Sequence, residues 1–139
     1  MTHSVSTTWL EKMAFESQVS GHKIIMDANE EAGGEDRGPR PKPLVLSALG
    51  GCTGMDVIHV LKKMRIQPTF FNVAIEGTLS EEQPKRYTQI HLTYEFKESD
   101  NLDAQKVETA VKLSQEKYCS VSALLRRGAE VTYEIKYLS

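Results

Sequence analysis

The chain has 139 residues, of which 40% are apolar and 26% are charged, the balance of an ordinary globular protein of one domain. Its net charge is −2, which disfavours the class of general nucleic-acid-binding proteins, because these carry a basic surplus. Two cysteines cannot form a disulfide framework, and the first residues lack the basic and apolar regions of a secretory signal. We therefore expect a single domain over residues 1–139, cytoplasmic, with reduced thiols and without nucleic acid or membrane as partners.

The N-terminal part of the sequence predicts three short strands followed by a long loop. Residues 7–10, 13–19 and 23–27 carry partial period-2 alternation with aromatic and β-branched side chains. Residues 28–42 hold three glycines and two prolines among charged side chains. A loop of this length is often functional.

A helix is predicted over residues 44–64, with Pro43 as its first residue. The segment Leu44–Leu61 is apolar enough to resemble a membrane span. It is shorter than the roughly 20 residues that a bilayer requires, and it would place Asp56 and His59 inside the hydrocarbon. We interpret it as a helix buried in protein.

The rest of the chain predicts an α+β fold with the order βββ-α-ββ-α-β. Strands are expected over residues 70–79, 87–97 and 129–138, a second helix over 104–118 capped by Asp103, and a short turn over 120–127. The strand over residues 87–97 has one apolar face, formed by Ile90, Leu92, Tyr94 and Phe96.

The first helix contains Gly50, Gly51 and Gly54, each of which costs about 1 kcal/mol relative to alanine. Such a cost is explained if another backbone or a substrate approaches closely. Because this helix is apolar nearly all round, a chain of this size can hardly cover it. We expect a homodimer with these helices near the two-fold axis; the alternative is a tightly packed core helix in a monomer.

Two cysteines are candidate reactive groups. Cys52 lies among the three glycines, which open access to its sulfur, although a free cysteine is often buried and inert. Cys119 precedes the turn over residues 120–127, where N–H groups could assist it, or it is a small residue at a helix junction. The two cysteines could meet if both helices pack on the same side of the sheet.

The sequence offers little support for a metal site. His59 follows Cys52 by seven residues, about 10 Å along a helix, which is too far to share one metal ion. Asp56 is adjacent to Cys52 on the helix and would raise the thiol pKa, so we do not expect it to be catalytic. Asp56 is expected to pair with a basic residue or to cap a neighbouring element.

Several motifs together resemble the OsmC/Ohr family, and the resemblance covers nearly the whole chain. The motifs are Gly38–Pro41, Leu44–Thr53 with Cys52, Asp56-Val57, Lys62–Arg65 and, around the second cysteine, Cys119–Ser122. The resemblance implies an OsmC-like intertwined homodimer with sites at its interface.

The resemblance also implies cysteine-based peroxidase chemistry, part of an oxidative stress response. Cys52 matches the peroxidatic cysteine, Cys119 matches the resolving cysteine, and an external dithiol restores both without a cofactor. Arg37 is the nearest match to a loop arginine that contacts the thiolate, and Arg40 is a weaker one. The family places a glutamate at the start of the helix, where this chain has Lys42-Pro43.

The sequence thus predicts a thiol-dependent reductase of organic hydroperoxides. Leu49, Met55 and a partner chain would make its pocket apolar and favour bulky substrates. The missing glutamate favours the alternative, a non-catalytic dimeric binding protein for small apolar molecules on the same fold. The cysteine pair and a loop arginine favour the enzyme.

Overall fold

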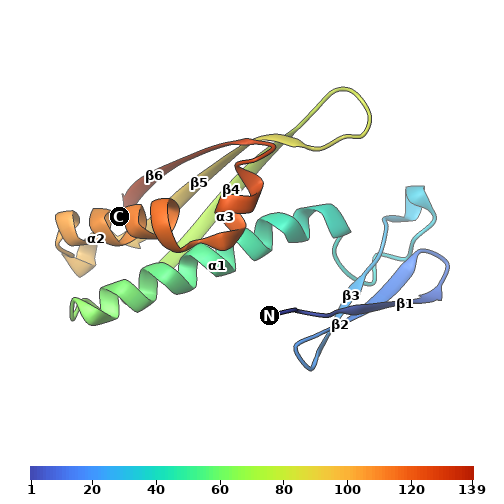
Figure 1. Cartoon of the computed structure of the whole chain (residues 1–139), viewed down its shortest axis with the longest axis horizontal. Coiled ribbons are helices and arrows are strands. Elements are labelled where there is room, and N and C mark those ends of the chain that lie inside the picture. Colours follow the sequence, from blue (N-terminus) through green and yellow to red (C-terminus); the bar gives the residue numbers. More distant parts are fainter. The chain divides into compact units, whose positions relative to one another are not determined.

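The computed structural model describes residues 1–139 and has the predicted α+β order, with the short turn after the second helix forming a third helix. The chain forms two compact units, residues 1–45 and 46–139, and helix α1 (Pro41–Lys63) begins in the first and continues in the second. Figure 1 labels the elements. That the chain folds as a single domain stays a prediction.

The first unit contains an antiparallel sheet of three strands in the order β1-β2-β3. Its strands are β1 (Ser6–Glu11), β2 (Ala14–Val19) and β3 (His22–Met26). Tight turns connect them, with Lys12, Ser20 and Gly21 at positive φ. All three predicted strands are therefore confirmed, with their ends shifted by at most one residue.

The loop after β3 is ordered around the buried carboxylate of Asp27. This carboxylate accepts hydrogen bonds from the backbone N–H groups of Ala28 at 2.7 Å and of Glu35 and Arg37 at 3.1 Å. The 3-10 turn η1 (Glu30–Ala32) lies within the same loop. The segment with three glycines and two prolines is thus wrapped around one acidic side chain.

The second unit contains a sheet of β4 (Phe71–Leu79), β5 (Tyr87–Lys97) and β6 (Glu130–Leu138). Central β5 is antiparallel to β4 and parallel to β6, since a helical crossover separates β5 from β6. The predicted apolar face of β5 is fully buried, and its other face carries polar residues such as His91 and Glu95.

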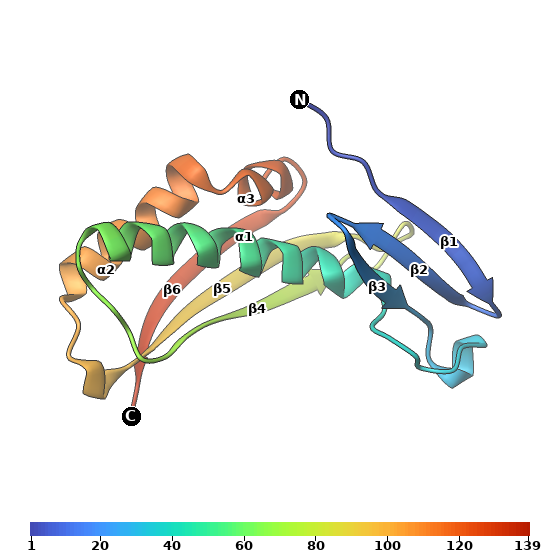
Figure 2. The same ribbon diagram turned by 90° about the horizontal axis from the view of Figure 1, so that it is seen from below.

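The helices of the second unit all cover the apolar face of this sheet (Figures 1 and 2). Beside α1 lie α2 (Ala104–Leu113), a π-helical turn η3 (Ser114–Tyr118) and α3 (Ser120–Leu125). A 3-10 turn, η2 (Glu98–Asp100), precedes α2. The core between the helices and the sheet includes Leu49, Val57, Leu61, Leu92, Tyr94, Phe96, Val107, Ala110 and Val111.

The ends of the helices differ from the predicted ones in two places. Helix α1 begins at Pro41 rather than Pro43, because both prolines lie in the first turn, where N–H groups have no helical partner. The helix predicted over residues 104–118 is divided, since α2 ends at Leu113 and the π-helical turn η3 follows it directly. Asp103 caps α2 as predicted, accepting from the N–H groups of Gln105 and Lys106.

Helix α1 is long and apolar enough to cross a membrane by length and composition, a test that core helices also pass. One face of α1 is part of the core, through Leu49, Thr53 and Val57. The opposite side is open, with Met55 76% exposed and Ile58 41% exposed. Within this chain, α1 is therefore a core helix with one uncovered side.

Candidate active site

The two cysteines lie together, although 66 residues separate them in the sequence. The Sγ atoms of Cys52 and Cys119 and a carboxylate oxygen of Asp56 all lie within 4.8 Å of one another. Both cysteines are free thiols; Cys52 is half-buried and Cys119 is buried. The expectation that the helices bring the cysteines together on one side of the sheet is confirmed.

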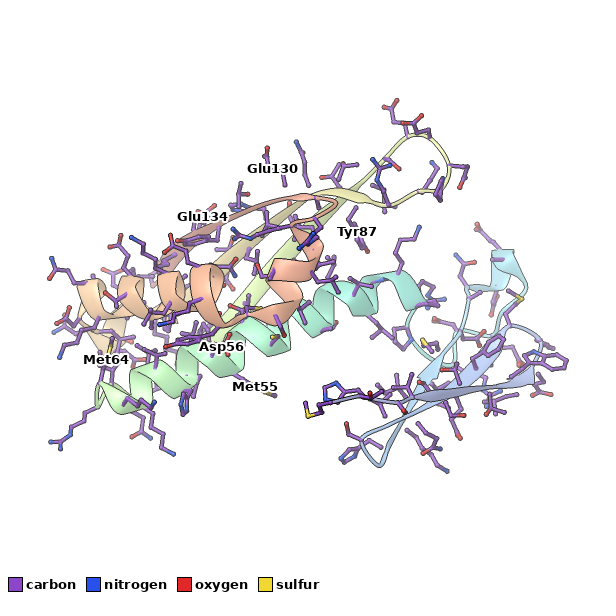
Figure 3. The ribbon with its side chains drawn as sticks, viewed as in Figure 1. Met55, Asp56, Met64, Tyr87, Glu130 and Glu134 are labelled. Carbon is purple, nitrogen blue, oxygen red and sulfur yellow. The ribbon has the colours of Figure 1, made fainter.

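Helix α1 positions Cys52 and Asp56 on one side because residues four apart are neighbours on a helix. Between them, Thr53 is fully buried toward the sheet. In Figure 3, Asp56 points from α1 toward α2 and α3, whereas Met55 points away from them. The side of α1 that faces the second cysteine is therefore acidic and thiol-bearing.

The π-helical turn η3 positions Cys119. The backbone N–H of Cys119 donates to the carbonyl of Ser114 at 2.8 Å, which closes the wide turn. Cys119 then leaves helical geometry and becomes the N-cap of α3, where its Sγ accepts from the N–H of Ser122 at 3.4 Å. Such π turns are frequent at functional sites, and here the turn aims a sulfur at α1.

Burial raises the pKa of the Cys119 thiol to about 11. The N–H of Ser122 acts in the opposite direction, but it is outweighed by burial together with the neighbouring Cys52 and Asp56. The expectation that helix N–H groups would assist Cys119 is therefore only partly met. Cys119 is a neutral thiol at physiological pH.

A chain of buried hydroxyl groups ends at Asp56. The hydroxyl of Ser114 donates to the Asp56 carboxylate at 3.0 Å, and Ser114 also bonds Thr53 at 2.6 Å. Thr53 in turn bonds the hydroxyl of Tyr94 at 2.7 Å. The single hydroxyl proton of Ser114 is donated to Asp56. Thr53 must therefore donate to Ser114, and Tyr94 must donate to Thr53.

Gln115 continues this chain on the other side of Tyr94. Its amide donates to the Tyr94 hydroxyl at 2.7 Å, and its carbonyl accepts from Ser122 at 2.9 Å and from the Arg126 guanidinium at 2.7 Å. Each hydrogen bond in this series is donated in the direction that leads from Arg126 toward Asp56. Sequence reasoning missed this network; its only signal was Ser114, a polar residue on the apolar stripe of the helix predicted over residues 104–118.

Asp56 differs from the sequence-based expectation. None of the five ion pairs of the chain includes Asp56, and it caps no neighbouring helix. Instead, it accepts from Ser114 beside both sulfurs. The carboxylate is thus placed within the cysteine site, where the sequence had predicted only a structural partner.

The loop cations lie in the first unit, so the contact of Arg37 with Cys52 stays a prediction. Arg37 pairs with Glu11 of β1 at 3.7 Å. Arg40 pairs with Asp36. A carboxylate beside Arg37 is therefore present even though the helix start carries Lys42 and no acidic residue.

The glycines of α1 have different surroundings. A side chain at Gly50 would approach Ile75 of β4 within 3.2 Å, so this glycine permits close packing of the helix on the sheet. Gly51 faces open space and leaves the surface beside Cys52 bare. Leu49 is fully buried in the core, so it does not line an open pocket as the sequence had suggested.

Comparisons with known proteins agree with the fold. Residues 33–134 match the family model described as OsmC-like protein. Protein YhfA of Escherichia coli K12 is 36% identical over 132 residues, covering 94% of this chain and 95% of YhfA.

Solved structures extend the likeness to the whole chain. A hypothetical protein from Aquifex aeolicus VF5 is 30% identical with a TM-score of 0.81, covering 100% of this chain and 99% of that one. An organic hydroperoxide resistance protein OsmC from Legionella pneumophila is 18% identical with a TM-score of 0.71, covering 98% and 97%. The chain belongs to the OsmC-like family, as its cysteine motifs suggested.

Proposed function

We propose that the chain reduces organic hydroperoxides with Cys52 as the attacking and Cys119 as the resolving cysteine. The observation that carries this proposal is the placement of both sulfurs within 4.8 Å, from elements far apart in sequence. The Legionella protein of the same fold is named for organic hydroperoxide resistance, which supports the same chemistry.

Burial distinguishes the two cysteines. Cys52 is half-buried beside the bare surface of Gly51, so a peroxide can reach its sulfur. Cys119 is buried, and its thiol pKa of about 11 makes it a poor first nucleophile. The structure therefore favours Cys52 for attack on the substrate and Cys119 for the second step.

In the first step, the Cys52 thiolate attacks the terminal oxygen of a hydroperoxide ROOH. The O–O bond breaks, the alkoxide takes a proton to give the alcohol ROH, and Cys52 becomes a sulfenic acid. The sulfur loses two electrons, and the peroxide gains them. Arg37 is our candidate for the cation that stabilises the thiolate, because arginine stays charged and can donate to sulfur and oxygen together.

In the second step, the sulfur of Cys119 attacks the sulfur of the Cys52 sulfenic acid. The S–O bond breaks, and the thiol proton of Cys119 leaves with the hydroxide as water. An external dithiol then exchanges twice with the Cys52–Cys119 disulfide and leaves as its own oxidised form. The cycle requires no cofactor and suits a reducing compartment such as the cytoplasm.

The test is consumption of cumene hydroperoxide with dihydrolipoamide, measured for wild type, Cys52→Ser, Arg37→Ala and Arg40→Ala. We expect turnover in wild type and none with Cys52→Ser, because serine lacks the reactive thiolate. Arg37→Ala should slow turnover at least about 10-fold, whereas the matched Arg40→Ala should leave it nearly unchanged. Full activity of Cys52→Ser would exclude the mechanism.

The same assay separates the second candidate function. The apolar side of α1 around Met55 and Ile58, together with a second chain packed beside it, favours a binding role for small apolar molecules as well. A wild-type protein that consumes no hydroperoxide with any dithiol, and that still binds cumene alcohol, would support the binding protein and overturn the peroxidase.

A further inference from the structure

The site of Cys52, Asp56 and Cys119 gathers three acidic groups without a cationic partner in any ion pair of the chain. We propose that in the reduced state these three side chains bind a thiophilic divalent cation, with zinc as the fitting metal. Thiolate sulfur and carboxylate oxygen are both zinc ligands, and thiolates select zinc over magnesium or calcium.

The geometry of the cluster suits one small ion. Ligand atoms around tetrahedral zinc lie roughly 3.7 Å apart, given bond lengths of about 2.3 Å to sulfur and about 2.0 Å to oxygen. The three donor atoms here already lie within 4.8 Å of one another. Side-chain rotations alone can therefore bring them into coordination, without a change in the helices.

The surroundings of the donors resemble the outer shell of a metal site. Asp56 accepts from Ser114 at 3.0 Å, and Cys119 accepts from the N–H of Ser122 at 3.4 Å. Both hydrogen bonds leave at least one lone pair of the carboxylate oxygen and of the sulfur free for a metal ion, and they hold these two ligand atoms in orientation. The hydroxyl chain through Thr53 and Tyr94 aligns its O–H dipoles toward the carboxylate.

Electrostatics supply the reason for a dication. The two sulfurs and the Asp56 carboxylate lie together at a partly buried site, where their negative charges would repel one another without a cation. A doubly charged ion offsets two of the three negative charges of the two thiolates and the carboxylate, and two thiol protons leave to solvent when it binds. The half-exposed position of Cys52 leaves a fourth ligand place for water.

Metal binding and the proposed redox cycle use the same sulfurs and exclude each other. Zinc holds both thiolates, so the bound form cannot attack a peroxide, and the Cys52–Cys119 disulfide cannot bind zinc. Binding is measured without peroxide, so its outcome is independent of the proposed function. A protein that binds zinc but reduces no hydroperoxide would retain the metal site and lose only the redox role.

The test is titration of reduced, full-length protein with zinc against a chromogenic chelator, in a phosphine reductant that does not compete as a dithiol would. Cobalt(II) serves as the spectroscopic probe, because sulfur-to-cobalt charge-transfer bands report thiolate ligands. The variants are Cys52→Ser, Cys119→Ser and Asp56→Asn. His59→Asn is the matched control, an exposed imidazole on the same helix.

We expect one zinc per chain with submicromolar affinity and a tetrahedral thiolate spectrum with cobalt. Each cysteine variant should lose affinity on the order of 100-fold, and Asp56→Asn at least about 10-fold, whereas His59→Asn should match wild type. Wild-type protein oxidised to the disulfide should bind no zinc, which gives a control that folds with the native sequence. Binding that survives oxidation, or loss with His59→Asn, would overturn the proposal.

Discussion

At the scale of single residues, the two thiols differ in exposure, and burial weakens the acidity of Cys119. Cys119 is 4% exposed, and its thiol pKa is raised to about 11, whereas Cys52 is half-buried. We expect iodoacetamide at neutral pH to alkylate Cys52 at least about 10-fold faster than Cys119, because the reagent requires an accessible thiolate. Labelling of Cys119 should rise as the pH approaches 11. Mass spectrometry of tryptic peptides measures both rates, and equal rates would contradict the assignment of roles.

The resolving role of Cys119 gives a second prediction. In Cys119→Ser, the sulfenic acid on Cys52 has no partner thiol in reach, so it should persist after one equivalent of cumene hydroperoxide. A dimedone probe should label Cys52 in this variant and far less in wild type, where peptide mapping should find the Cys52–Cys119 disulfide. Strong dimedone labelling of wild type would show that the two sulfurs do not react with each other.

The sequence predicted both cysteines but not the third member of their cluster. The i,i+4 relation of Cys52 and Asp56 is visible in the sequence, since both lie on one helix. The closeness of Cys119 to these two residues is not visible in the sequence, because it depends on how α3 packs against α1. A long-range approach of this kind leaves no periodic signal, so the role of Asp56 emerged only from the structure.

At the scale of elements, the hydroxyl chain joins α1, β5 and η3 through Tyr94, whose burial raises its pKa. Tyr94→Phe keeps the ring but leaves Thr53 and Gln115 each without one partner in the core. We expect the free energy of unfolding to fall by about 1–3 kcal/mol. Tyr133→Phe, on the more exposed neighbouring ring, should change it by less than about 0.5 kcal/mol. Urea unfolding measures both changes, and equal losses would show that the hydrogen-bonded hydroxyl chain contributes nothing to the free energy of unfolding.

The loop around Asp27 predicts a pH dependence of stability. Burial alone raises the Asp27 pKa, but hydrogen bonds from the N–H groups of Arg37, Ala28 and Glu35 and the Arg37 charge lower it overall. A lowered carboxyl pKa stabilises the fold above the unfolded value of about 3.9 and loses this contribution as the pH falls through the folded pKa. Asp27→Asn should therefore destabilise the protein at neutral pH.

Urea midpoints at about pH 7 and about pH 3 measure this contribution. Wild type should lose stability between these values, and Asp27→Asn should lose less. Glu31→Gln on the same loop, exposed and without such bonds, should follow wild type. If Asp27→Asn lost as much stability between the two pH values as wild type, the acid sensitivity would belong to other carboxylates.

Element order and the buried face of β5 could be read from periodicity, because alternation of apolar residues directly reports a half-buried strand. The break of the second helix at Ser114 could not, because a π-helical turn keeps helical composition and differs only in its hydrogen bonds. The wrapping of the loop around Asp27 was also hidden, since its partners are backbone N–H groups that no side-chain pattern reveals.

At the scale of the whole molecule, the open side of α1 favours the homodimer that the sequence predicts. Met55 and Ile58 are exposed there, and Gly51 permits close approach of a second chain. We expect sedimentation to show a dimer at micromolar concentration, and Ile58→Glu to shift it toward monomer. Gln89→Glu adds the same charge on the polar face of the sheet and should leave the dimer intact. A monomeric wild type would exclude this arrangement.

The sulfur that caps α3 gives this short helix a mechanical link to the oxidation state of the site. Cys119 starts α3 by accepting the N–H of Ser122 through the same atom that would bond Cys52. Forming that bond engages the sulfur that caps the helix, whereas in the reduced protein the same sulfur accepts only from the Ser122 amide. We then expect the first turn of α3 to fray when the two cysteines are oxidised. Faster amide hydrogen exchange in this turn would report the oxidation as a local loss of helix.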